Sequence, residues 1–190
     1  MSEYQYYEFC NVHSPLTSVA RKEMTSLSSR TQIGTHGVFY VYNYGDFRGD
    51  PKKLLLKHFD VFFYISNWGS VQLMFKYPSE QVDILKIKKY KIKDVINAEQ
   101  LGQYVVLELE LHNEEGGGWI EGEGLLSDLL PLYDEIKSKN YQILRLISAI
   151  HGEWMGENQK PLGKILSEFE LSEAQEAFLE SVGIDYKAAS

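Results

Sequence analysis

The residues best suited to bind a ligand lie in one short stretch, at positions 40–51. Its sequence is Tyr-Val-Tyr-Asn-Tyr-Gly-Asp-Phe-Arg-Gly-Asp-Pro, which places Asp46, Arg48 and Asp50 within five positions. An arginine between two carboxylates could clamp a carboxylate or phosphate group. The same residues also have structural roles, because Asp50 suits a helix N-cap, Asp46 suits a turn, and Arg48 can bridge the two. We favour the structural roles, since they explain all three residues without a ligand.

A hydrolase-type enzyme that uses Asp46, Asp50 or His58 is one alternative. The sequence has no Gly-x-Ser-x-Gly motif, no P-loop and no Gly-x-Gly-x-x-Gly motif. Cys10 and His13 are close in sequence, but side chains three positions apart on a strand point to opposite faces. We therefore assign no catalytic residue.

Patterns typical of metal sites are also missing from the sequence. The five histidines show no His-x-x-x-His spacing, and a single cysteine excludes a multi-cysteine zinc site. Four glutamates near residues 113–124 could offer oxygen ligands to a divalent cation: Glu114, Glu115, Glu121 and Glu123. This loop lacks the Asp-x-Asp-x-Asp-Gly pattern of a calcium loop, so we predict no metal and no cofactor.

Aromatic residues in polar, glycine-containing loops favour a protein interface. Loops often carry binding residues, and large aromatic side chains are common interface anchors. We therefore predict a non-catalytic module that binds a protein partner, or a second copy of itself, through three loops. The same aromatics could instead fill the core. The predicted binding residues are Tyr42, Tyr44, Asp46, Phe47, Arg48, Asp50, Trp68 and Trp119.

Single-stranded nucleic acid is an alternative partner. Residues 37–42, Gly-Val-Phe-Tyr-Val-Tyr, partly match the RNP1 strand on which RNA-recognition modules stack bases. The match lacks the basic first residue and the last aromatic residue. In this alternative Tyr40 stacks on a base, and Lys88, Lys89 and Lys91 contact phosphates. We favour the competing prediction that helices cover the tyrosines, because an exposed patch of five tyrosines is unusual in a monomer.

The elements that must hold these residues alternate between strand and helix. Pro15 and Pro51 each follow a capping residue and predict two helices. Residues 31–33 predict a short strand, and the order β-α-β-β-α-β, with one extra strand, predicts an α+β fold with a ferredoxin-like antiparallel sheet. Aromatic or alternating segments predict its strands at residues 4–12, 38–44, 61–65 and 71–77. One open face of this sheet should carry Tyr4, Tyr6, Tyr40, Tyr42 and Tyr44.

The rest of the chain changes character twice. Residues 85–93 contain five lysines, and their apolar alternation shifts phase as at a bulge or break; such lysines are typical of an exposed sheet edge. Residues 104–111 predict a half-buried strand, after which the apolar spacing becomes helical. We predict an α+β sheet domain at 1–112, a Gly/Glu-rich loop at 113–124 and a helical region at 125–190 packed on the sheet, or one domain containing all three.

The composition is that of a globular protein, with 44% hydrophobic and 24% charged residues among 190. No apolar run approaches the roughly 18 residues of a membrane helix, and the first residues show no signal-peptide pattern. We therefore predict a cytoplasmic protein without membrane contact. The net charge of −8 is unevenly divided, since residues 1–93 have 13 basic and 8 acidic residues, and residues 94–190 have 6 and 19. Such a division is typical of an acidic helical tail, or of surfaces that attract each other or different partners.

Several longer motifs are specific enough to compare with known families. They are Met-Ser-Glu-Tyr-Gln-Tyr-Tyr-Glu-Phe, Tyr-Asn-Tyr-Gly-Asp-Phe-Arg-Gly-Asp-Pro, Phe-Asp, Asn-Trp-Gly, Leu-Met-Phe and Gly-Trp-Ile-Glu-Gly-Glu-Gly-Leu-Leu. Together they resemble a family of uncharacterised bacterial proteins. The similarity extends to the closing Ile-Asp-Tyr-Lys-Ala-Ala-Ser, and longer members carry a further helical region. The resemblance implies a bacterial cytoplasmic protein and no catalytic role.

Overall fold

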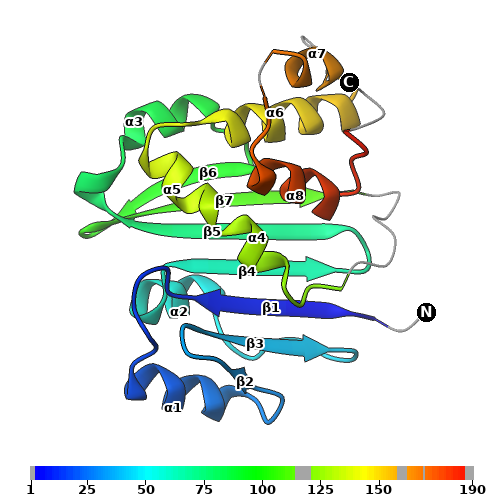
Figure 1. Ribbon diagram of the computed structural model, residues 1–190. Coiled ribbons are helices and arrows are strands. Elements are labelled where there is room, and N and C mark those ends of the chain that lie inside the picture. Colours follow the sequence, from blue (N-terminus) through cyan, green and yellow to red (C-terminus); the bar gives the residue numbers. More distant parts are fainter. Residues whose placement is uncertain (1–2, 114–120, 158–161, 169, 187–190) are drawn as a thin grey trace.

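A seven-stranded antiparallel sheet with helices on both faces forms the protein (Figure 1). The computed structural model describes residues 3–113, 121–157, 162–168 and 170–186. Within these ranges no helix combines the length and the hydropathy that crossing a bilayer requires. The mixture of helices and strands confirms the predicted α+β class.

The strands contribute side chains alternately to the two faces of the sheet. In chain order they are β1 (Gln5–Cys10), β2 (Gln32–Ile33), β3 (Gly37–Tyr42), β4 (Val61–Ser66), β5 (Ser70–Pro78), β6 (Ile96–Leu101) and β7 (Tyr104–His112). Across the sheet their order is β2-β3-β1-β4-β5-β7-β6, and every neighbouring pair is antiparallel. Strand β1 therefore lies between β3 and β4, with Tyr7 opposite both Tyr40 and Tyr64.

Capping residues set where several helices begin. The helices are α1 (Ser18–Leu27), α2 (Pro51–His58), α3 (Ile84–Ile87), α4 (Leu125–Leu129), α5 (Pro131–Lys137), α6 (Gln142–Trp154), α7 (Leu162–Leu166) and α8 (Glu173–Ser181), with 3-10 turns η1 (Ser79–Gln81) and η2 (Lys88–Tyr90). Asp50 caps α2 as predicted, and Ser172 caps α8 within a capping box formed with Gln175. The predicted start of the first helix at Ser14-Pro15 is wrong, because the Thr17 side chain caps α1 by accepting from the Ala20 N–H at 3.1 Å.

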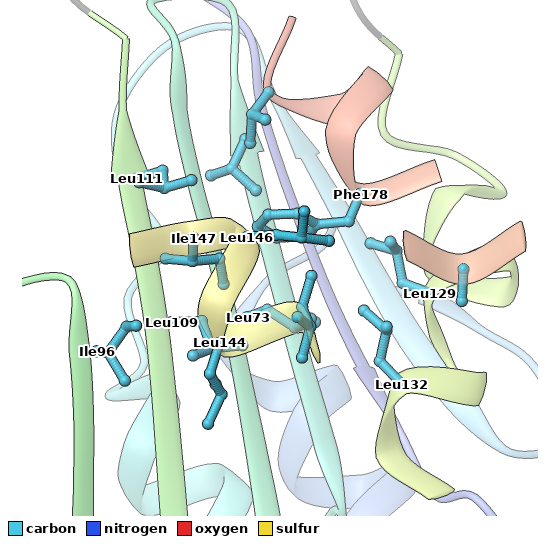
Figure 2. Close-up of a cluster of buried hydrophobic side chains, with 14 of the residues drawn as sticks. Leu73, Ile96, Leu109, Leu111, Leu129, Leu132, Leu144, Leu146, Ile147 and Phe178 are labelled. Atoms are coloured by element: carbon cyan, nitrogen blue, oxygen red, sulfur yellow. The ribbon is translucent and has the colours of Figure 1, made fainter. Parts of the chain in front are cut away.

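The larger core lies between the sheet and the C-terminal helices. Figure 2 shows Leu73 and Leu109 of the sheet facing Leu144 and Ile147 of α6, with Phe178 of α8 beside them. These side chains are almost fully buried. Burial of apolar surface at this face holds helices α4 to α8 on the sheet.

A smaller core lies on the opposite face, under α1 and α2. Phe9 and Phe62 of the sheet pack there with Leu54 and Leu55 of α2 and with Met24 of α1. These helices reach the half of the sheet formed by β3, β1 and β4 (Figure 1). The rest of this face, on β5, β7 and β6, carries mostly polar side chains.

The sheet as a whole does not have the predicted ferredoxin-like order. That order requires each helix to link parallel strands with one strand between them. Helix α2 does so, since β3 and β4 both run antiparallel to the intervening β1. Helix α1 does so as well, since β1 and β2 both run antiparallel to the intervening β3. The difference lies beyond β4, where β5, β7 and β6 extend the sheet to seven strands, whereas the β-α-β-β-α-β motif has four.

The lysine-rich segment is also not the predicted sheet edge. Residues 84–90 form α3 and η2, and the Asp83 side chain caps α3 by accepting from the Lys86 N–H at 3.2 Å. The change of phase in the sequence therefore marks a helical turn. The edge strand on this side of the sheet is β6, whose sequence, Ile-Asn-Ala-Glu-Gln-Leu, lacks the regular alternation that predicts a strand.

Candidate functional site: the aromatic end of the sheet

The loop that joins β3 to α2, residues 43–50, is held by local features. Gly45 has a φ of +72°, a left-handed conformation that favours glycine. A Cβ on Gly49 would come within 2.6 Å of the Phe47 ring, so glycine lets the loop close over that side chain. The Asp50 carboxylate accepts from a backbone N–H in the first turn of α2 at 3.0 Å. The predicted passage from an aromatic strand to a capped helix is confirmed.

Aromatic residues around this loop have opposite environments. Phe47 is buried, and its ring centroid lies 4.9 Å from that of Tyr40 and 5.2 Å from that of Tyr7. Tyr42 is also buried, beneath the guanidinium of Arg30. Tyr44 is 71% exposed. Phe47 and Tyr42 are thus core residues, and Tyr44 is the aromatic residue that the loop presents to solvent.

The three charged residues of the loop do not converge on a ligand site. All three are exposed, and among the described residues no ion pair joins Arg48 to Asp46 or Asp50. Asp50 instead pairs with Lys53 at 3.2 Å. The hydrogen bond from the Lys53 backbone N–H lowers the pKa of Asp50, which is the behaviour of a helix cap.

The first residues of the sheet connect three loops at one end. The Gln5 side-chain amide donates to the Gly45 carbonyl at 3.1 Å. The Tyr4 N–H donates to the Asn67 side chain at 3.0 Å, and the Asn67 N–H donates to the Tyr4 carbonyl at 3.1 Å. The Gly122 N–H donates to the Tyr4 hydroxyl at 2.8 Å. The loop at 43–50, the β4–β5 turn and the last part of the acidic loop therefore meet here.

We call this region the aromatic end and define it by Tyr44, Asp46, Asn67 and Trp68. Trp68, in the β4–β5 turn, is 39% exposed. Because β1 separates β3 from β4, the strand ends that carry the two aromatic residues lie about 10 Å apart, two strand spacings. Figure 1 shows both turns at the same end of the sheet, beside the N-terminus. Trp119 lies outside the described residues.

Three residues that the sequence does not single out, Tyr7, Tyr64 and Gln5, support the aromatic end through hydrogen bonds. The Tyr7 hydroxyl donates to the Gln5 side-chain oxygen at 2.5 Å, and the Tyr64 hydroxyl does so at 3.5 Å. Burial raises the pKa of both phenols, and the Asp46 carboxylate adds to this. They stay protonated at neutral pH and hold the amide that binds Gly45. Their contacts span up to 59 positions, so no local motif signals them.

The residues of the nucleic-acid alternative lie on separate parts of the molecule. Tyr40 is fully buried, and its hydroxyl donates to the Met24 carbonyl at 2.9 Å, so its ring offers no face to a base. Lys88, Lys89 and Lys91 are exposed, around η2.

The tyrosines do not form one open face. Tyr4 and Tyr6 belong to the core under the C-terminal helices, whereas Tyr40 and Tyr42 belong to the core under α1 and α2. The register decides this, since Tyr40 lies opposite Tyr7 and not opposite Tyr6.

The residues of the hydrolase alternative do not share a pocket. Asp50 and His58 lie at opposite ends of α2, about 12 Å apart at 1.5 Å per residue. The His58 Nε2 lies 2.7 Å from a carboxylate oxygen of Glu23, so this ring nitrogen already has a structural partner. Cys10 is buried, and burial raises the pKa of its thiol to about 11, so it is not a ready nucleophile at neutral pH.

A polar groove of about 550 Å³ lies on the half of the sheet that α1 and α2 leave open. Gln72, Glu108 and Glu110 line it, together with the turn at residues 91–95. Lys52 of α2 lies 3.0 Å from Glu108, and the Gln72 amide donates to Glu110 at 3.3 Å. Burial and the neighbouring carboxylates raise the pKa of Glu110. The sequence indicates that the two glutamates lie on one face of a strand. It does not indicate which strands lie beside that strand.

Within the described ranges, no group of three or more His, Cys, Asp or Glu side chains could hold a metal ion. Comparison with models of protein families, with curated proteins and with solved structures finds no match to this chain. The function must therefore be argued from the geometry above.

Proposed function

We propose that this chain is a non-catalytic interaction module of a bacterial cytoplasmic system, and that it binds a protein partner through the aromatic end. The observation that carries the proposal is the pairing of exposed Tyr44 and Trp68 on two loops that β1 holds together. Tyrosine and tryptophan are enriched among residues that dominate binding energy.

The support beneath these residues suits an interface. Phe47 anchors one loop in the core, and Asn67 fixes the other turn to Tyr4 through two backbone-directed hydrogen bonds. Loops that are already ordered lose less conformational entropy when a partner binds. Asp46 and Arg48 are exposed polar residues of the same loop as Tyr44, and interface rims are polar.

An affinity pull-down tests this proposal. The bait is the full chain, as wild type, as Tyr44→Ala/Trp68→Ala, and as Val19→Ala. Val19 is a matched control, because it is an exposed apolar residue (63%) on α1. We expect a protein that wild type and Val19→Ala retain and that the double variant loses.

A thermal unfolding curve for each bait verifies that the variants are folded. Retention of the same protein by the folded double variant would refute the proposal.

A further inference from the structure

Charges of opposite sign gather on two surfaces of the molecule. The excess of basic residues in 1–93 and of acidic residues in 94–190 is visible in the sequence. The structure concentrates part of each excess, on the segment of residues 84–93 and on helices α4 and α8.

The basic surface consists of the lysines around α3 and η2 together with Leu85. Leu85 is 74% exposed, which is the largest exposure among the large hydrophobic residues of the described chain. Five exposed lysines follow it within eight positions of the chain: Lys86, Lys88, Lys89, Lys91 and Lys93. Lys86 pairs with Asp83 at 4.0 Å and Lys93 with Asp94 at 3.8 Å, but in the described ranges the other three have no ion pair.

The acidic surface is a groove of about 360 Å³ between α4 and α8. Asp128 and Glu173 on its rim are exposed, and Glu176 is partly exposed. Ala174 and Ala177 contribute a small apolar floor. The groove therefore combines an apolar floor with a negatively charged rim. The basic surface combines an exposed leucine with neighbouring positively charged lysines.

These surfaces do not satisfy each other within one molecule. Figure 1 shows α3 at the left of the helical layer and α8 farther right, with α5 and α6 between them. Interactions between exposed charges are largely screened beyond a Debye length, about 10 Å at 0.1 M salt. Complementary surfaces that are apart on one molecule can meet between two.

We propose that the basic surface of one copy docks on the acidic groove of a second copy, with Leu85 against the apolar floor and the lysines against the carboxylates. The contact joins two different surfaces, so it is heterologous and builds either a closed ring or an open chain. Its energy comes largely from exposed ion pairs, so association is weak and sensitive to salt. This inference does not depend on the aromatic end.

Sedimentation equilibrium of the full chain at low salt tests the proposal. The average mass of wild type should exceed that of one chain, rise with protein concentration and fall as sodium chloride is added. In the variant Lys88→Glu/Lys89→Glu, both docking surfaces of the molecule are acidic. In the variant Glu173→Lys/Glu176→Lys, both are basic. Each reversal alone should weaken association at least about tenfold, because like charges then face each other.

Mixing the two reversed variants is the sharpest arm. Every contact between them is complementary again, so the mixture should associate within about threefold of wild type. Lys22→Glu/Lys53→Glu is a charge-matched control on α1 and α2 and should still associate, as should Tyr44→Ala/Trp68→Ala. A wild type that stays a single chain at low salt, or a mixture that does not recover, overturns the proposal.

Discussion

Two short segments of this protein share a design but expose different chemistry. In each, an aspartate caps a helix, with one apolar residue buried and another exposed. Residues 43–51 bury Phe47 and expose Tyr44 before the cap at Asp50. Residues 83–93 begin with the cap at Asp83, then expose Leu85 and bury Ile87.

The difference lies in what surrounds each exposed residue. Tyr44 and Trp68 belong to two loops at the same end of the sheet, and both offer large rigid side chains. Leu85 is followed in the chain by exposed lysines, which are flexible and charged. The first segment is therefore suited to binding through contact area, and the second to binding through electrostatic attraction. Added salt should weaken binding at the second segment much more than at the first.

The largest expected effect is on stability, from Phe47. Phe47→Ala removes a ring packed among Tyr7, Phe9 and Tyr40, and should lower the free energy of unfolding by about 3–5 kcal/mol. Tyr44→Ala should change it by less than about 0.5 kcal/mol. Urea unfolding followed by circular dichroism measures both. Equal losses would mean that the two side chains do not differ in burial.

A smaller loss is expected from Gly49. A Cβ there would lie 2.6 Å from the Phe47 ring and 2.7 Å from Leu54, so Gly49→Ala should cost about 1–3 kcal/mol through overpacking. Gly34→Ala is the control, because its Cβ would have an ordinary contact of 3.6 Å. The same urea experiment compares them, and a Gly49→Ala protein as stable as the control would contradict the close packing.

The cap at Asp50 should contribute less again, and its contribution should depend on pH. Asp50→Ala should cost about 1 kcal/mol at neutral pH. The folded-state pKa is lowered from 3.8 by the hydrogen bond from Lys53, so the carboxylate's contribution is present above about pH 4 and is lost as pH falls through the folded pKa.

Asp50→Asn is the matched control, because asparagine also caps helices but does not titrate there. The difference in unfolding free energy between wild type and Asp50→Asn should decrease as the pH falls below about 4. A difference that stays constant down to pH 2 would argue against this origin of the cap.

The smallest expected effect is that of salt on partner binding, and it distinguishes the aromatic end from the charged surfaces. Partner binding at the aromatic end should change by less than about threefold over a range of salt that abolishes self-association, because exposed charges contribute little there. Isothermal titration with the purified partner provides the measurement. Strong salt dependence would mean that the partner binds a charged surface and not the aromatic end.

Local parts of this fold were predictable because their causes are local. The connection from β3 to α2 follows from Gly45, Asp50 and Pro51, and the sequence shows all three. The register was not predictable, because the pairing of Tyr40 with Tyr7 depends on contacts 33 positions apart, 40 minus 7. A shift of one position would exchange the faces.

The candidate site divides in the same way. Sequence reasoning found the loops and their aromatics, but could not distinguish Phe47, which fills the core, from Tyr44, which does not. Only the packing of α2 against the sheet makes that distinction. The lysines at residues 85–93 resembled a guarded sheet edge because helical and extended spacings coincide over so few residues.

Site-specific photo-crosslinking in living cells tests the central claim most directly. A photoreactive phenylalanine analogue replaces Tyr44 in one strain and Val19 in another, both exposed positions. We predict a crosslinked protein adduct from position 44 that is absent from position 19 and reduced when Trp68→Ala is added. No adduct from position 44, or the same adduct from both positions, would contradict the assignment of the aromatic end as the partner-binding surface.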